Sequence, residues 1–531
     1  MHQLGDGSRL EDLRSHAIAI ATAWSASAAA STTVGQERAI LRLFGVAGLD
    51  RAGRPLAAEV VDRYLAPDPR RLGGGIALPF AMAMVEYDHG VGELALEVAA
   101  GNVDLGLEAE LLGQTGRRAA AEARAVALAR SATERIDANR VARRELLGLL
   151  GDPQRPWIGL AIESPAIVDA LDEAGASVDA GIDLLAVAIP PSRELAERMN
   201  RLGASVEAWR AAPSSRGGLD APDRHAAPVP AGSQRALSVL RRFMDEAGAR
   251  RRGYVRLLTE AQALAAPDQA VVAAFERIDV VVADPMREIV TGRVDPDRAL
   301  ADHVFAHRLL DRAGTRILVP AGPLMVTTDL AAGIPSDPAT RSGRALALQL
   351  LTVALARRNG LVPDAVSVGA LPDWIAEEAA APARAAAEVA LRRVLLPEHP
   401  LSFVEPANLS SGRVTWHALV AALLADAGDV DMILRRSRGP VGTLAVESIG
   451  AAAVAVGMRG SRSPGSLEGL ALDHAIASVA AAEATLAVLE DGGWRAFVDQ
   501  PLGLPAMLGA EAVAGRREMF DPLGALANGG G

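Results

Sequence analysis

Short apolar runs alternate with longer amphipathic segments from residue 157 onward, and this pattern constrains the fold most. Strands that alternate with helices are typical of a parallel sheet with helical crossovers. The predicted strands are 157–162, 182–189, 254–258, 278–283, 316–319, 365–368, 401–404 and 430–434. The predicted helices include 166–174, 234–247, 296–312, 339–358, 374–393 and 414–425. Eight such units favour an α/β fold with a closed TIM-like (β/α)8 barrel over an open doubly wound sheet.

The chain divides into three parts by its pattern. Apolar positions recur at helical spacing in 37–44, 56–65 and 119–150, and a turn-rich stretch at 151–156 ends this region. Beyond Gly439 the chain is rich in Gly and Ser, apart from a predicted helix at 467–489. We therefore expect a helical N-terminal extension (1–150), the barrel (151–438) and a helical and loop C-terminal extension (439–531).

The composition excludes several kinds of chemistry. The chain has 531 residues and no cysteine, and all 54 of its basic residues are arginine, so lysine is absent as well. It can supply no Schiff-base lysine, thiolate nucleophile or cysteine-held metal. A net charge of −11 argues against nucleic acid as a partner. The apolar run 17–30 follows acidic residues and predicts an amphipathic first helix, not a signal peptide, so we expect a cytoplasmic protein without membrane contact.

Three motifs with a possible cofactor role are each better explained structurally. His303 and His307 have the spacing of a helical metal pair, but Val304 replaces the glutamate of metalloproteases, so a solvated helix face is expected. Asp223 and His225 have the spacing of a cobalamin-ligating loop, whose glycine position holds Pro228. The glycines at 73–75 could bind phosphate, although flexible entry into a helix is the simpler interpretation. We predict no metal site.

Polar side chains at the carboxyl ends of the predicted strands are the candidate pocket residues, because TIM barrels carry their chemistry there. These are Glu163, Thr259, Glu260, Asp284, Thr327, Thr328 and Glu405. The same residue types also cap helices, so each of them has a structural alternative.

Two segments resemble a known family. Residues 32–45 read Thr-Thr-Val-Gly-Gln-Glu-Arg-Ala-Ile-Leu-Arg-Leu-Phe-Gly. This is similar to the Thr-Thr-Val-x-x-Glu-Arg-Ala-x-x-Arg-Leu-x-Gly segment of lysine 5,6-aminomutase α subunits. Residues 254–284 form the second specific match, and fainter ones, such as 100–105 and 521–522, extend the resemblance in order over nearly the whole chain.

The resemblance implies a (β/α)8 barrel with helical extensions that works with a smaller β subunit. That partner carries adenosylcobalamin on a Rossmann-like domain and supplies the lysine for pyridoxal phosphate. The reaction implied is a radical 1,2-shift of the terminal amino group of D-lysine or β-lysine, a small amino-acid substrate. The absence of lysine from this chain agrees with that division of labour.

The residues that line the family's pocket differ here. Residues 189–194, beginning with Ile189, replace Arg-Thr-Thr-Gly-Gln-Ser, which helps to hold the cofactor phosphate. Gln262 replaces the serine that faces the pyridine ring, and Arg287 replaces a tyrosine. Pro323 and Glu405 lie in two further altered turns.

We therefore expect a diverged aminomutase α subunit with a remodelled pocket, with Gln262 and Arg287 as further pocket candidates. Adenosylcobalamin and pyridoxal phosphate are implied only by the resemblance. Two alternatives stay open: a barrel enzyme that acts on another substrate without pyridoxal phosphate, and a non-catalytic scaffold that binds a cobalamin-carrying partner.

Overall fold

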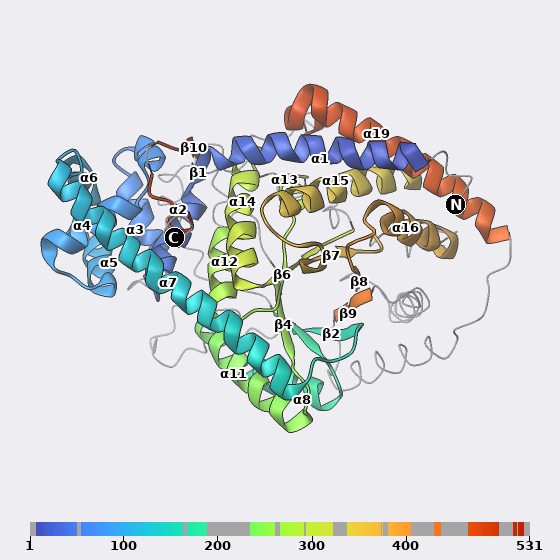
Figure 1. The fold of residues 1–531 in the computed structure, drawn as a ribbon, viewed down its shortest axis with the longest axis horizontal. Coiled ribbons are helices and arrows are strands. Elements are labelled where there is room, and N and C mark those ends of the chain that lie inside the picture. The colour runs from blue at the N-terminus through green and yellow to red at the C-terminus, as the bar shows by residue number, and fades with distance from the viewer. Residues whose placement is uncertain are drawn as a thin grey trace.

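Eight parallel strands close into a barrel in the computed structural model, in the order β2 to β9 along the chain (Figure 1). They are β2 (Trp157–Ile162), β3 (Leu184–Val187), β4 (Arg256–Glu260), β5 (Val280–Val282), β6 (Arg316–Val319), β7 (Val366–Gly369), β8 (Leu401–Val404) and β9 (Val430–Arg436). The barrel closes where β9 pairs with β2, with Met432 opposite Trp157. The predicted TIM-like barrel is confirmed.

The structure describes thirteen segments of the chain. These are residues 7–49, 55–162, 167–187, 234–260, 266–290, 294–321, 337–372, 374, 381–404, 430–436, 466–498, 513–517 and 519–524. The predicted helix at 414–425 and the Asp223 and His225 motif lie outside them.

Helices follow the strands and cover the outside of the barrel. They are α8 (Ile167–Asp179), α11 (Gln234–Arg251), α12 (Ala266–Phe275), α13 (Pro285–Val290), α14 (Pro296–Ala313), α15 (Pro338–Arg358) and α16 (Ala381–Leu395), with the short 3-10 turn η3 (Pro363–Ala365) before β7. α14 and α15 begin alike: Asp295 and Asp337 accept backbone N–H groups through their side chains, and proline follows each.

All eight predicted strands occur, and only β4 is shifted in a way that affects the site. The apolar run predicted a strand at 254–258, whereas β4 starts at Arg256 and ends at Glu260. Tyr254 is buried before the strand, and its hydroxyl donates to Asp279 (3.0 Å). Thr259 and Glu260 are therefore the last two residues of β4.

Side chains fill the amino-terminal end of the barrel. The guanidinium groups of Arg256 and Arg316 lie 3.6 and 5.5 Å from the centre of the Trp157 ring. Above this layer the interior is mostly apolar, with Leu184, Leu258, Val280, Leu318 and Met432 among its buried residues. The hydroxyls of Ser367 and Ser402 contact each other there. Ligands would accordingly reach the barrel from its carboxyl end, where TIM barrels bind them.

The described residues before the barrel, 7–49 and 55–150, form mainly helices beside and across it. α2 (Val34–Leu43), α3 (Leu56–Leu65), η1 (Pro69–Gly74), α4 (Ala77–Tyr87), α5 (Val91–Ala100) and α6 (Leu105–Leu111) lie at one end of the molecule. The long α7 (Thr115–Leu150) runs from α4 past α12, α14 and α11 (Figure 1).

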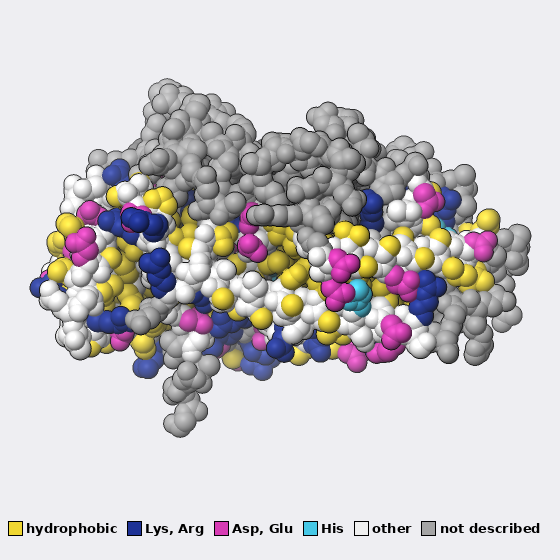
Figure 2. Space-filling model, turned by 90° about the horizontal axis from the view of Figure 1, so that it is seen from above, with side chains coloured by type: hydrophobic (Ala, Val, Ile, Leu, Met, Phe, Trp, Pro, Cys, Tyr) yellow, Lys and Arg dark blue, Asp and Glu magenta, His cyan; other side chains and the backbone are white. Residues whose placement is uncertain are grey.

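The two ends of the described chain meet. α1 (Gly7–Ala29) runs beside α19 (Ser466–Val498), with Arg9 paired to Glu483 (2.7 Å) and His16 to Glu490 (2.8 Å). Both helices lie against α15, and the face that carries them mixes apolar with charged side chains (Figure 2). β10 (Val513–Gly515) pairs antiparallel with β1 (Ser31–Thr33), so the C-terminal segment reaches the N-terminal helices.

One described helix segment, Leu470–Asp491 of α19, is long and apolar enough to cross a membrane by length and composition. In the structure its buried residues, such as Ala475, Val479, Ala482 and Leu486, belong to the common core. This arrangement is that of a core helix in a globular protein.

Candidate functional site at the carboxyl end of the barrel

An ion pair marks the carboxyl end of β4 and β5. Nη2 of Arg287, on α13, lies 2.6 Å from Oε1 of Glu260, the last residue of β4. About a quarter of each side chain is exposed (25% for Arg287 and 28% for Glu260), so the pair can meet a ligand. Because both groups are charged and partly dehydrated, they can bind a substrate that carries one positive and one negative group.

Asp284 holds α13 in place rather than pointing into solvent. Its Oδ1 accepts from the backbone N–H groups of Met286 (3.1 Å) and Arg287 (3.2 Å) and from Oγ1 of Thr352 (2.9 Å). Burial raises the pKa of the Asp284 carboxyl, against the effect of these donors. Asp284 thus acts as the N-terminal cap of α13 and orients Arg287 towards Glu260.

Thr259 faces the helices and not the interior of the barrel. It shares a strand face with Leu257, which belongs to the core between sheet and helices, whereas Leu258 belongs to the interior cluster. Thr259 is fully buried, and its Oγ1 has no hydrogen-bond partner among the described residues. Apart from Glu260, which shares the strand face of Leu258, the side chains that face inward near the same end include the small or apolar Ala161, Ala186, Val282 and Val404. Because side chains alternate between the two faces of a strand, the sequence alone could have shown that Thr259 and these residues lie on opposite faces.

The other predicted pocket residues lie outside the described residues. These are Glu163, Gln262, Thr327, Thr328 and Glu405, together with Ile189 and Pro323 of the altered turns. The structure therefore brings together Glu260, Asp284 and Arg287 from three consecutive parts of the barrel, and these three remain our pocket hypothesis.

The expected solvated face at His303 and His307 is wrong, because both side chains are fully buried. α14 lies between α12, α1 and α7, so the histidines face other helices. Nε2 of His303 lies 3.2 Å from Oε1 of Glu288, and the two imidazole rings are 5.7 Å apart. Among the described residues, no group of three or more His, Cys, Asp or Glu side chains could hold a metal ion.

The pKa values of the two histidines shift in opposite directions. Burial alone would lower the pKa of His303, but the neighbouring Glu288 carboxylate outweighs it and raises that pKa. Burial, and then the charge of His303, lower the pKa of His307 well below its usual value. His307 is therefore neutral in the folded protein at neutral pH.

We expect acid to destabilise the fold through His307. Its folded pKa is depressed below the unfolded value near 6.5, so the unfolded chain gains a proton that the folded chain does not. The contribution is present above pH 6.5 and lost as pH falls below it, about 1 kcal/mol between pH 6.5 and 5.5. His307→Phe, which keeps a ring but does not titrate, should lose that much less stability in urea denaturation over this range. With both proteins referenced to pH 7.5, equal pH slopes would contradict the prediction.

The segment 32–45 builds framework rather than the pocket. Oγ1 of Thr33 caps α2 by accepting from the N–H of Gln36 (3.0 Å) and donates to Asp302 of α14. Nε2 of Gln36 donates to the carbonyl of Ala301 (2.7 Å). Glu37 accepts from the backbone N–H of Ile76 (2.7 Å), where α4 begins after the glycines at 73–75. The Glu37 side chain thus accepts the backbone N–H group that a phosphate bound at these glycines would use.

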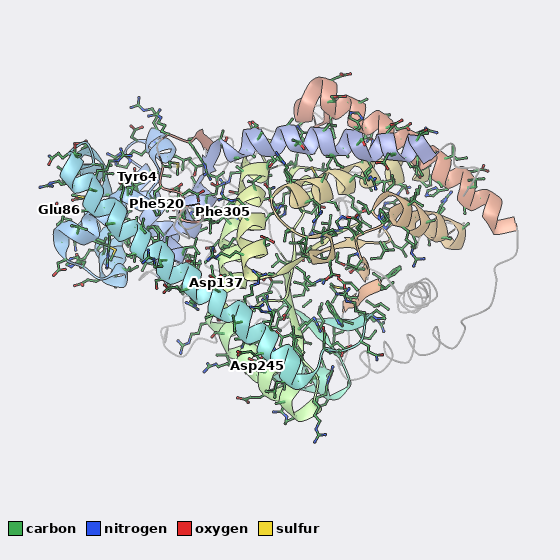
Figure 3. The ribbon with its side chains drawn as sticks, in the orientation of Figure 1. Tyr64, Glu86, Asp137, Asp245, Phe305 and Phe520 are labelled. Atoms are coloured by element: carbon green, nitrogen blue, oxygen red, sulfur yellow. The ribbon has the colours of Figure 1, made fainter. Side chains whose placement is uncertain are left out.

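The segment from Tyr254 to Asp279 is also framework. Asp279 accepts from the N–H of Leu257 (2.9 Å) and lies 3.2 Å from Nε of Arg143 and 3.3 Å from Nη1 of Arg241. Aromatic side chains also lie between the N-terminal helices and α14, where Figure 3 labels Tyr64, Phe520 and Phe305. The Phe44 and Phe520 rings are 6.4 Å apart.

Comparison with known proteins identifies the family. The family model described as "D-Lysine 5,6-aminomutase TIM-barrel domain of alpha subunit" matches residues 4–205 and 230–428. The chain belongs to this family. It is 24% identical over 410 residues to the lysine 5,6-aminomutase alpha subunit of Acetoanaerobium sticklandii, covering 77% of this chain and 72% of that one. It is 25% identical over 386 residues to the subunit of the same name from Fusobacterium nucleatum subsp. nucleatum, covering 72% and 68%.

The aminomutase family match spans the N-terminal helices and the barrel as far as residue 428. A solved dihydropteroate synthase from Burkholderia cenocepacia is also similar, with 16% identity and a TM-score of 0.32 over 58% of this chain and 94% of that one. The predicted family resemblance is confirmed.

Proposed function

We propose that this protein is the barrel subunit of an adenosylcobalamin- and pyridoxal phosphate-dependent aminomutase, acting in the cytoplasm on a small amino acid. The observation that carries the proposal is the family match across the N-terminal helices and the barrel. The lack of lysine supports a division of labour in which a smaller partner subunit supplies both the cobalamin and the lysine for pyridoxal phosphate.

The donor set at the carboxyl end of the barrel fits a cofactor or substrate held without a covalent bond. Pyridoxal phosphate needs an amine for attachment, which this chain lacks, and partners for its anionic groups. Arg287 is such a partner for phosphate or carboxylate, and Glu260 is one for an ammonium group. When bound, adenosylcobalamin supplies the radical and pyridoxal phosphate carries the migrating amino group.

This chain's own residues then bind, orient and exclude water. Arg287 and Glu260 exchange their mutual contact for contacts with the carboxylate and ammonium of the amino acid. Asp284 keeps α13, and therefore Arg287, in register with β4. The apolar side chain of Val282 lines the end of the neighbouring strand β5, which lowers the local dielectric and strengthens these charge contacts.

The same ion pair favours a second candidate, a barrel enzyme that acts on another substrate without pyridoxal phosphate. According to the resemblance, family members have an uncharged tyrosine at the position of Arg287. The ion pair therefore gives this site a different distribution of charge. A non-catalytic scaffold is the third possibility, and turnover distinguishes it from the first two.

A complex with a cobalamin-binding partner is the direct test of the proposal. We expect the chain, co-expressed with a small cobalamin-binding β subunit, to elute from gel filtration with that subunit at micromolar concentration. Interfaces of at least about 1,200 Å² usually hold such subunits together at this concentration. Separate elution of the two proteins, each folded by circular dichroism, would argue against the proposal.

A further inference from the structure

A buried chain of polar side chains connects the C-terminal helix to the carboxyl ends of β6 and β7. It runs from His474 on α19 through Glu388 and Arg392 on α16 to Gln349 on α15. None of these side chains is more than 7% exposed, and both Arg392 and Glu388 are essentially inaccessible. Buried polar groups are costly unless they are paired, so a chain this complete constrains every element that it touches.

Gln349 is the end of the chain that touches the barrel. Its Nε2 donates to the backbone carbonyls of Pro320 (2.8 Å) and Gly369 (3.0 Å), which follow β6 and end β7. Its Oε1 accepts from Nε of Arg392 (2.8 Å), which fixes the orientation of the amide. Nη2 of Arg392 also donates to the carbonyl of Ala321 (3.3 Å). Two side chains thus set the spacing of the two strand ends.

Glu388 and His474 form the other end. Glu388 accepts from Nη1 of Arg392 (2.5 Å) and pairs with Nε2 of His474 (3.0 Å). The Glu388 carboxyl loses solvation by burial, but Arg392 and the donors around it lower its pKa to about 2, so it is ionised at neutral pH. Ser342 of α15 also contacts Nε2 of His474 (3.2 Å).

Close backbone contacts leave this row of buried polar side chains little freedom to adapt. A Cβ atom at Gly343 would lie 2.4 Å from the carbonyl oxygen of Ser478, so α15 and α19 meet backbone to backbone beside Ser342. A Cβ atom at Gly369 would lie 2.5 Å from the backbone nitrogen of Ala321, so the ends of β6 and β7 are equally close. Figure 1 shows α19 lying over α15, on the outside of the barrel.

We propose that α19 positions the β6 and β7 end of the site through the buried chain His474, Glu388, Arg392 and Gln349. Gln349 and Arg392 are then positioning residues, which act on the strand ends and not on the substrate. The functional consequence rests on the proposed function, which locates the substrate at this end of the barrel.

Hydrogen exchange on the complete protein tests the positioning without relying on activity. In His474→Leu, which leaves Glu388 without this donor, amide exchange at residues 319–321 and 369–371 should rise about tenfold or more. His474→Gln keeps an N–H for Glu388 and should bring the rates back to within about threefold of the wild type. Amides at the opposite ends of the same strands, such as that of Arg316, should not change.

A matched control separates positioning from loss of packing. Leu486→Ala destabilises the docking of α19, because Leu486 is a fully buried core residue. The change leaves the four buried polar side chains themselves intact. It should raise exchange within α19 and leave residues 319–321 and 369–371 unchanged. The proposal is overturned if His474→Leu leaves these strand ends unchanged, or if Leu486→Ala accelerates them as much.

Turnover gives a second and separate measurement. If the complex is active, kcat/KM for its amino-acid substrate should fall about tenfold in His474→Leu and recover in His474→Gln. An inactive wild-type complex would count against the proposed function alone, because the exchange measurements decide the positioning independently.

Discussion

The reconstituted complex should turn over D-lysine and β-lysine about a thousandfold more slowly than ordinary members of the family. Four residues differ from the family pattern at positions that bind charged or polar groups of the cofactor or substrate: Ile189, Gln262, Arg287 and Pro323. A lost hydrogen bond to a buried polar group costs on the order of 1–3 kcal/mol, and more for a charge. A total near 4 kcal/mol, without strict additivity, corresponds to about a thousandfold in rate.

Turnover of both lysines with both cofactors present is the measurement. A variant that restores the two family residues, Gln262→Ser with Arg287→Tyr, should recover part of the rate, whereas Arg14→Gln on the exposed face of α1 should have no effect. A wild-type rate comparable to that of family members would show that the pocket is intact and that the strand ends are aligned differently.

Replacing Asp302 with alanine should destabilise the protein by about 3–5 kcal/mol, because it leaves Arg298 charged and alone in the core. Both side chains are almost inaccessible, at 0% for Arg298 and 1% for Asp302, and Nε of Arg298 lies 3.0 Å from Oδ2 of Asp302. Burial raises the pKa of Asp302, against the effects of Arg298 and Thr33. Buried ion pairs generally add little net stability, because the loss of solvation offsets their attraction. The cost arises from the unpaired charge that remains, and Thr33 loses its acceptor as well.

The free energy of unfolding in urea measures this effect. The double variant Arg298→Met with Asp302→Leu removes both charges and should cost far less than the single change. Glu11→Ala, at the exposed pair with Arg14, should change stability by less than about 1 kcal/mol. A single Asp302→Ala variant as stable as the double variant would show that water reaches Arg298.

The sequence by itself determined the barrel, because its period and its punctuation are local properties. Each strand is a short apolar run and each helix carries its own apolar stripe, so the pattern of 316–319 and 401–404 predicted β6 and β8 with their observed ends. The absence of lysine and cysteine excluded whole classes of chemistry in the same way. The segments 32–45 and 254–284 indicated the family.

The tertiary structure decided which side chains meet, because that depends on residues distant in the sequence. The solvated face expected for His303 and His307 failed because α12, α1 and α7 cover α14 on several sides, which one helix's own pattern cannot reveal. The strand predicted at 254–258 begins only at Arg256 in the structure. The hydroxyl of Tyr254 instead donates to Asp279, which lies 25 positions later in the sequence. The pairing of Glu260 with Arg287, and of α1 with α19 near the opposite end of the chain, likewise required the closed barrel to bring those elements together.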